Sequence, residues 1–255
     1  MSPLLRIVLL YALVPVVCTI IGAVAGAFWP VMRRVRAHVL HLAAGVVFAV
    51  VSVELLPEIM RPALVVYVVI GFALGIATML GVDRILDRMR GDDDDAADDA
   101  AAGAGGRKTP VVGVSLLVAV GIDFLLDGLL LGVGFAAGAR IGIMLALAEA
   151  AEQLSVGLAL AGELTAAGAS RLRVVAIVSA LGSLVFLSAV LGATVLSGLR
   201  DGWMEAVLSF GLAALLYLVT EELLREAHEE RESTTGTAMF FAGFLIYLVI
   251  GMTLG

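Results

Sequence analysis

Long uninterrupted runs of apolar residues dominate this sequence. Eight such runs follow one another, and in each the apolar residues form a block and not an amphipathic stripe. A helix that crosses the hydrocarbon core of a bilayer needs about 20 predominantly apolar residues. We therefore predict an all-α integral membrane protein, a bundle of eight transmembrane helices, with spans at residues 4–28, 38–57, 63–86, 110–139, 141–164, 174–199, 204–224 and 235–254.

The eight spans leave almost no chain for a soluble domain. Hydrophobic residues make up 61% of the sequence, which is more than in ordinary soluble proteins, so we expect residues 1–255 to form a single transmembrane domain. The segment 87–109 contains GDDDDAADDAAAGAGG, and such a polar, glycine-rich composition predicts a disordered loop. The single cysteine, Cys18, excludes an internal disulfide or a cluster of thiolate ligands.

The distribution of positive charge predicts the orientation of the chain. Cytoplasmic loops retain Lys and Arg. With the N-terminus outside, the inner loops hold twelve of the 16 Lys and Arg residues and the outer loops hold four. We expect a plasma-membrane protein with both termini extracytoplasmic and the acidic 87–109 loop in the cytoplasm.

A short internal repeat suggests how the spans are related. ELLPE at 54–58 ends the second span, and ELLRE at 222–226 ends the seventh. These two spans cross the membrane in opposite directions. Inverted repeats are typical of secondary transporters, which bind their substrate between the halves near the midplane.

Two neighbouring spans carry acidic side chains far from their ends. Asp123 and Asp127 lie one helical turn apart on the fourth span, and Glu149, Glu152 and Gln153 share one face of the fifth. A charged side chain at the centre of a span costs about 2.5 to 3.5 kcal/mol, so such residues usually face a partner or a cavity. The connection between the two spans is very short, which makes them antiparallel neighbours whose polar faces can converge.

Four carboxylates in one pocket must be protonated, paired with cations or bridged by metal, because they otherwise repel one another. The two spans contain no Lys, Arg or His except Arg140 at the turn between them. The sequence therefore favours a metal or proton site over an internal salt bridge, and protonated carboxyls with a structural role are the alternative.

The same residues resemble the motifs of the ZIP (Zrt/Irt-like) family of divalent metal transporters. DFLLDG at 123–128 is similar to the fourth-span motif His-Asn-x-x-Asp/Glu-Gly, with Asp123 in the His place and Phe124 in the Asn place. AEAAEQ at 148–153 is similar to the fifth-span motif, in which Glu149 and Glu152 match acidic positions. The second span contains AAGVVFAVVSVELLPE, which resembles the family's second-span motif with Glu54 in a His place. The seventh span contains LLYLVTEELLRE, which resembles the seventh-span motif.

The resemblance implies eight spans, extracytoplasmic termini and transport of a divalent metal substrate toward the cytoplasm. The expected metal ligands are Asp123, Asp127, Glu149, Glu152 and Gln153; the expected entrance residues are Glu54 and Glu58, and the expected exit residues are Glu222, Glu226 and His228. Phe124 stands in place of Asn, and the sixth span offers only Ser183 and Ser188 as polar side chains near its middle. Both features favour one bound metal over two.

The ligand chemistry and the resemblance point to different ions. The resemblance implies zinc, whereas a site with only oxygen ligands favours harder ions such as manganese, ferrous iron or magnesium. A proton- or sodium-coupled carrier of another solute and a non-transporting metal sensor are the competing interpretations. We expect no enzyme, no organic cofactor and no nucleic-acid partner; glycine-bearing helix faces permit a homodimer.

Overall fold

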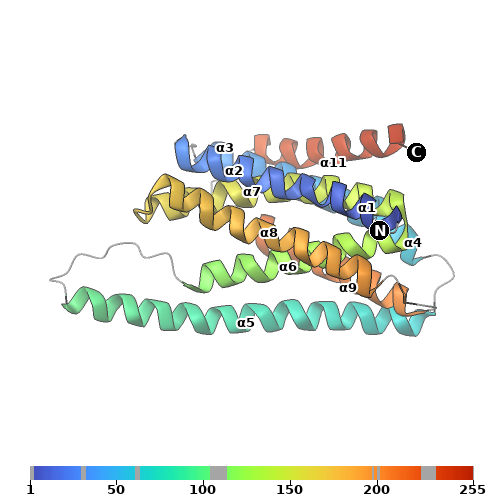
Figure 1. Cartoon of the computed structure of the whole chain (residues 1–255), viewed down its shortest axis with the longest axis horizontal. Helices are drawn as coiled ribbons and strands as arrows, with labels where there is room; N and C mark the ends of the chain where they lie inside the picture. Colours follow the sequence, from blue (N-terminus) through green and yellow to red (C-terminus); the bar gives the residue numbers. More distant parts are fainter. Residues whose placement is uncertain are drawn as a thin grey trace.

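The computed structural model describes residues 3–29, 33–60, 64–103, 114–196, 198–199, 202–224 and 234–254. Its regular elements, all of them helical in these ranges, are α1 (Pro3–Tyr11), α2 (Leu13–Phe28), α3 (Arg33–Val50), η1 (Val51–Leu55), α4 (Leu56–Ile59), α5 (Val65–Gly103), α6 (Val114–Ala137), α7 (Ala139–Ala166), α8 (Arg171–Val195), α9 (Gly202–Tyr217), η2 (Leu218–Leu223) and α11 (Thr234–Leu254). The long helices run roughly side by side, with α5 and α11 on opposite sides of the bundle (Figure 1).

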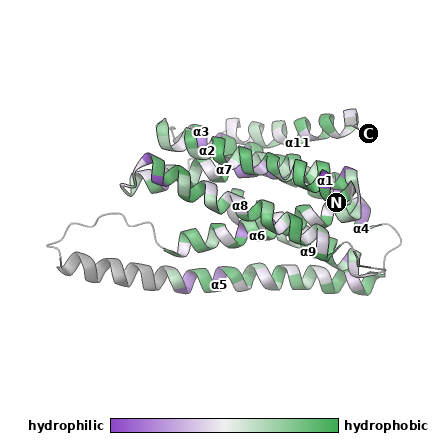
Figure 2. Ribbon diagram, in the orientation of Figure 1, coloured by the Kyte–Doolittle hydropathy of each residue, from purple (hydrophilic) through white to green (hydrophobic). Residues whose placement is uncertain are grey.

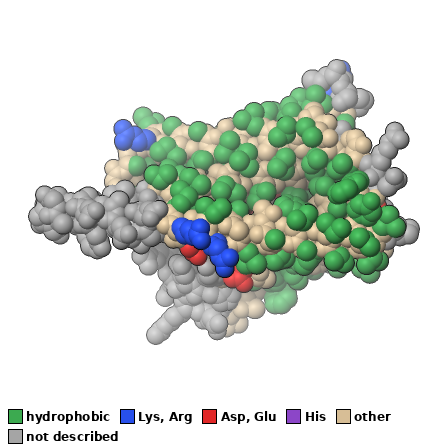
Figure 3. Space-filling model, turned by 90° about the horizontal axis from the view of Figure 1, so that it is seen from below, with side chains coloured by type: hydrophobic (Ala, Val, Ile, Leu, Met, Phe, Trp, Pro, Cys, Tyr) green, Lys and Arg blue, Asp and Glu red, His purple; other side chains and the backbone are tan. Residues whose placement is uncertain are grey.

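Within the described residues, eight helical stretches are long and apolar enough to cross a membrane, which confirms the predicted fold class. The first runs from Leu4 to Phe28, as expected, and the second runs from Val35 to Ile59 through α3, η1 and α4. Hydrophobic residues dominate most of the helices (Figure 2), and hydrophobic side chains cover much of the face drawn in Figure 3. Large exposed residues such as Phe72, Leu191 and Phe241 are suited to contact with lipid.

The third span continues as helix beyond the predicted end of the apolar run. The sequence predicts a loop over 87–109, whereas α5 extends through Gly103; residues 104–113 lie outside the described residues. Extending an existing helix fixes one residue for each added hydrogen bond, and this part of α5 contains several alanines, the best helix formers. The acidic composition alone therefore did not determine where the helix ends.

Glycines bring the helices together in four close pairs. Gly22 of α2 lies against the backbone of α7 at Leu154, and Gly132 of α6 lies against α8 at Ala189. Gly45 of α3 meets α11 at Phe240 in the same way. A fourth contact joins α5 to α9, where Gly71 lies against Ala206. In each case an added Cβ would collide with backbone atoms of the partner helix, so these helix faces are occupied within the chain.

The arrangement of these pairs agrees with the predicted inverted repeat. In the predicted repeat, the first span corresponds to the sixth, the second to the seventh, the third to the eighth and the fourth to the fifth. Under this correspondence the α2–α7 pair becomes the α8–α6 pair, and the α3–α11 pair becomes the α9–α5 pair. The two matching motifs also share a local distortion, because Glu54 lies in the π-helical turn η1 and Glu222 lies in the π-helical turn η2. Such turns are rare and occur frequently at functional sites.

Candidate metal centre

The predicted polar faces of the fourth and fifth spans meet inside the bundle. The helix α6 ends at Ala137 and α7 begins at Ala139, so Gly138 alone separates the two antiparallel helices. The hydrogen bonds Gly138 N–H to Gly134 O and Gly142 N–H to Gly138 O hold this tight turn. The turn places Asp123 and Asp127 of α6 on the side that faces Glu152 of α7.

Three carboxylates form the cluster. Asp123, Asp127 and Glu152 each offer an oxygen atom, and these atoms all lie within 4.8 Å of one another. Asp127 is 3% exposed and Glu152 is 1% exposed, while Asp123 is partly buried. Carboxylates this close in a dry setting repel unless protons or a cation compensate their charge, and a divalent ion with oxygen ligands meets that need.

Gln153 supports this cluster with its nitrogen atom. Its Nε2 donates a 3.0 Å hydrogen bond to Asp127 Oδ2, and its Oε1 accepts a 2.9 Å hydrogen bond from the Thr19 hydroxyl of α2. Gln153 and Thr19 are both fully buried. The sequence predicts Gln153 as a metal ligand, but the oxygen atom that would bind metal faces Thr19. In this structure Gln153 orients Asp127, which is the part that outer residues often play at metal sites.

Glu149 lies near this group on α7 but is not one of the three clustered carboxylates. It is 1% exposed, and among the described residues neither of its carboxylate oxygens has a hydrogen-bond partner. A buried, unsatisfied carboxyl is costly. The structure thus brings together Asp123, Asp127, Glu152 and Gln153, and Glu149 lies one helical turn before Gln153 on α7.

The sixth span, α8, packs against α6 beside the site, where Gly128 of α6 lies against Val185 and Ser188. Phe124 of α6, next to Asp123, is fully buried. The Ser188 hydroxyl lies 2.8 Å from the Leu184 carbonyl of its own helix, and the exposed Ser183 donates to the Ala180 carbonyl. The Ser188 hydroxyl also lies 3.4 Å from the Phe124 carbonyl of α6, so Ser188 contacts both helices, whereas Ser183 bonds within α8.

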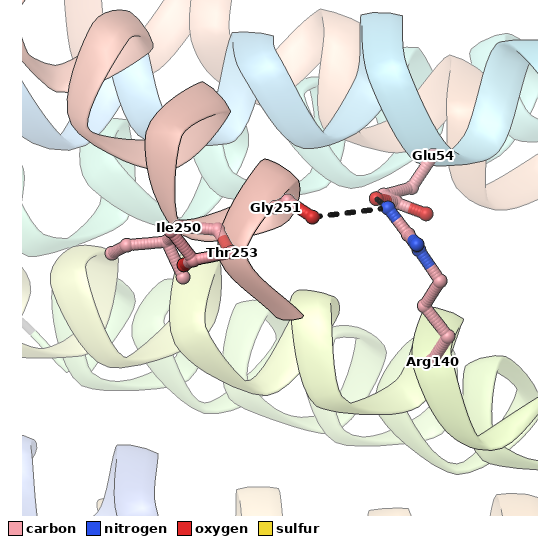
Figure 4. Close-up of polar contacts among 5 residues, drawn as sticks. All are labelled: Glu54, Arg140, Ile250, Gly251 and Thr253. Atoms are coloured by element: carbon pink, nitrogen blue, oxygen red, sulfur yellow. Dashed lines mark hydrogen bonds and ion pairs between the residues drawn. The ribbon is translucent and has the colours of Figure 1, made fainter. Parts of the chain in front are cut away.

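The predicted entrance residues lie at the end of the bundle where α6 turns into α7. Glu54 is 8% exposed and forms an ion pair with Arg140, whose Nη2 lies 3.5 Å from Glu54 Oε1 (Figure 4). Glu58 is partly buried in α4. Of the predicted exit residues, Glu226 and His228 lie outside the described residues, as does the side chain of Glu222.

Thr19 and Arg140 are the residues whose roles at the site the sequence did not predict. Thr19 is one hydroxyl in an apolar span, and it also lies 2.9 Å from the Pro15 carbonyl one turn earlier. Threonines in helices commonly bond to their own backbone in this way, so the composition gave no sign of a second contact. Arg140 is the charged residue of the predicted turn between the fourth and fifth spans, and its place on the same predicted side as Glu54 and Glu58 was the available signal for this contact.

Two comparisons with known proteins bear on this geometry. Residues 90–251, which include the whole cluster, match a family model described as "ZIP Zinc transporter". The chain is also 33% identical over 133 residues to a protein named zinc transporter GufA from Myxococcus xanthus. That similarity covers 51% of this chain and 51% of the relative, so the chain matches about half the length of this curated relative.

Proposed function

The chain belongs to the ZIP zinc transporter family, and from that premise we propose that it carries divalent metal ions across a membrane through the Asp123, Asp127 and Glu152 cluster. The observation that supports this proposal most directly is the meeting of three carboxylate oxygens within 4.8 Å inside an apolar bundle. A charged cluster is costly at that depth. A passing cation offsets the cost because it replaces carboxylate repulsion with attraction.

The proposed substrate is a divalent ion coordinated by oxygen. Zinc is the first ion to test because the relative with 33% identity is named as a zinc transporter. The cluster offers carboxylate oxygens without imidazole or thiolate, and this ligand chemistry suits manganese and ferrous iron. Glu149 remains a proposed additional ligand, because a bound ion would satisfy its buried oxygens.

The proposed route runs from Glu54 and Glu58, through the cluster, to Glu222, Glu226 and His228. It follows the predicted orientation, in which the Glu54 end is extracytoplasmic and net transport is toward the cytoplasm. Alternating exposure of the cluster to the two sides would move the ion, as in other carriers built from inverted repeats. The chain is an integral membrane protein; its placement in the plasma membrane is part of the proposal.

A homodimer also remains a proposal. The glycines at the four close helix pairs contact neighbours within the chain, so a second copy would have to pack on a different face. The exposed hydrophobic residues of α5, among them Val66 and Phe72, offer one such face.

Uptake of zinc, manganese and ferrous iron into proteoliposomes tests the function. The wild-type protein should give saturable uptake of at least one of these ions, and Asp127→Ala and Glu152→Ala should each abolish it. Ser183→Ala is a matched control, because this hydroxyl is exposed and bonds only to its own helix. Uptake that both carboxylate variants retain would exclude the cluster as the transport site.

The same experiment separates the competing functions. A coupled carrier of another solute would show no saturable divalent flux. A metal sensor would bind metal at the cluster in equilibrium measurements, lose that binding in Asp127→Ala, and show no flux.

A further inference from the structure

One cation joins three helices at the predicted outer end of the bundle. The Arg140 guanidinium lies near the start of α7, and its Nη2 atom is 3.5 Å from Glu54 Oε1 in η1 and donates a 3.2 Å hydrogen bond to the Gly251 carbonyl of α11 (Figure 4). That carbonyl belongs to the last turn of α11. The neighbouring Thr253 hydroxyl donates to Ile250 and not to Gly251.

Glu54 is a buried carboxylate whose ion pair with Arg140 is long. Its side chain is 7% exposed, whereas that of Arg140 is 52% exposed. The Oε1 atom has no hydrogen-bond partner among the described residues, since the contact with Arg140 is an ion pair at 3.5 Å and not a hydrogen bond. Tyr247, 1% exposed, lies close enough for the charges of Glu54 and Arg140 to act on its hydroxyl, which likewise has no hydrogen-bond partner in this part of the chain. Glu54 Oε1 and the Tyr247 hydroxyl are therefore two buried oxygen atoms without a hydrogen-bond partner among the described residues.

Stability of α7 does not explain why a cation occupies this position. Arg140 is the second residue of α7, and the N-terminus of a helix carries partial positive charge that disfavours a cation. Its favourable interactions are instead with groups outside α7, namely Glu54 and the end of α11.

Arg140 also connects the part of the molecule that carries the cluster with a different helix pair. The residue lies on the same helix as Glu152, about 18 Å away along the axis, while Glu54 and Gly251 belong to the closely packed α3–α11 pair. At the other end of the same two helices, Arg36 of α3 pairs with Glu163 of α7 at 3.0 Å. An ion pair thus joins the α3 span to α7 at each end.

We propose that Arg140 is a tethered cation that occupies Glu54 and holds the outer end of α7 against α3 and α11, so that an arriving divalent ion must displace it. This inference rests on the proposed transport function and deepens it. Arg140 acts as a specificity-determining residue, because a doubly charged ion competes for Glu54 more effectively than a singly charged one. It controls access to the cluster and contributes no ligand there.

Metal uptake by four variants tests the competition. Arg140→Gln should lower the half-saturating metal concentration by about two- to fivefold, the range expected for an exposed ion pair, because the competing cation is gone. Glu54→Gln should raise that concentration. Adding Arg140→Gln to Glu54→Gln should then have no further effect. Arg6→Gln, an exposed arginine on the same predicted side of the membrane, is the matched control and should behave as wild type.

Two outcomes of the uptake measurements would overturn the inference. One is an unchanged half-saturating concentration in Arg140→Gln, and the other is an equal shift whether or not Glu54 is present. If wild-type uptake is saturable and Asp127→Ala abolishes it, the proposed transport function stands even when the inference about Arg140 fails.

A second measurement does not depend on flux. Thermal unfolding of the purified protein in detergent should show coupling between Glu54→Gln and Arg140→Gln in a double-mutant cycle without metal, and the coupling should disappear in saturating zinc or manganese. Coupling that is absent without metal, or that metal leaves unchanged, would overturn the inference. If wild-type protein shows no saturable flux, the transport proposal fails, and this cycle still decides whether metal displaces Arg140 from Glu54.

Discussion

Thr19→Val tests whether a residue outside the carboxylate cluster sets its metal affinity. The substitution keeps the shape of the side chain and removes the hydroxyl that donates to Gln153 Oε1 at 2.9 Å. Gln153 in turn donates to Asp127 at 3.0 Å. A single methyl-for-hydroxyl change on α2 should therefore reach Asp127 on α6, a proposed metal ligand, through one amide on α7.

The size of the expected loss of metal affinity in Thr19→Val follows from the burial of these two hydrogen bonds. Thr19 and Gln153 are both fully buried, so the amide oxygen left by Thr19→Val has no access to water, and a buried polar atom without a partner costs about 1 to 3 kcal/mol. The amide can relieve that cost by rotating, but then its N–H no longer orients Asp127. Loss of such an outer contact typically lowers metal affinity about 10- to 100-fold, and we expect the lower end for one neutral hydrogen bond.

Equilibrium binding of manganese or zinc to the purified protein, by isothermal titration calorimetry, measures the effect. Thr19→Val should bind about 10-fold more weakly, and Thr19→Ser, which keeps the hydroxyl, should bind nearly as wild type. Thr194→Val is the matched control, because its hydroxyl is exposed and bonds to the backbone of α8. If Thr19→Val binds within twofold of wild type while Asp127→Ala loses binding, the proposed role of Gln153 is wrong.

Three further predictions follow from packing, charge and ligand type. Gly132→Ala should destabilise the protein by about 1 to 3 kcal/mol, because its Cβ would lie 2.6 Å from the Ala193 nitrogen. Gly121→Ala, whose Cβ would have its nearest neighbour at 3.6 Å, is the control and should not destabilise the protein. Thermal unfolding measures both variants, and equal losses of stability would contradict the packing explanation. Glu163→Gln should reduce the free energy of unfolding by no more than about 1 kcal/mol, since the Arg36–Glu163 pair is partly exposed, and a larger loss would show that solvent screening is weak there. Asp123→His should shift the uptake preference from manganese toward zinc, because imidazole suits zinc better than it suits manganese; an unchanged ratio in a competition assay would show that this residue does not coordinate the ion.

The spans were predictable because the bilayer imposes a simple rule on them. The first predicted span, Leu4–Phe28, agrees with the structure at both ends. The meeting of Asp123, Asp127 and Glu152 was also predictable, because helical spacing fixes which residues share a face and Gly138 leaves room only for a tight turn. These inferences depend on local sequence and on one short connection.

The remaining features depend on contacts between distant segments, which local patterns do not encode. Thr19 and Gln153 are 134 residues apart in the chain, and nothing in either span predicts that they meet. The same limit applies to the side-chain orientation of Gln153, which the sequence placed among the ligands. The polar composition of the segment after Leu86 also suggested a loop where α5 continues to Gly103, since charge pattern predicts solvent exposure better than backbone conformation.

The close helix packing and the polar site are parts of one arrangement. An added Cβ on Gly157 would lie 2.5 Å from the Thr19 carbonyl oxygen, and Gly157 follows Gln153 by one helical turn. The short distance between α2 and α7 at this glycine is what lets the Thr19 hydroxyl reach the amide. Gly128, next to Asp127, likewise brings α6 against Ser188 of α8. Substituting either glycine should therefore weaken metal binding as well as folding, whereas Gly45→Ala, at the α3–α11 contact, should affect stability far more than the affinity of the cluster.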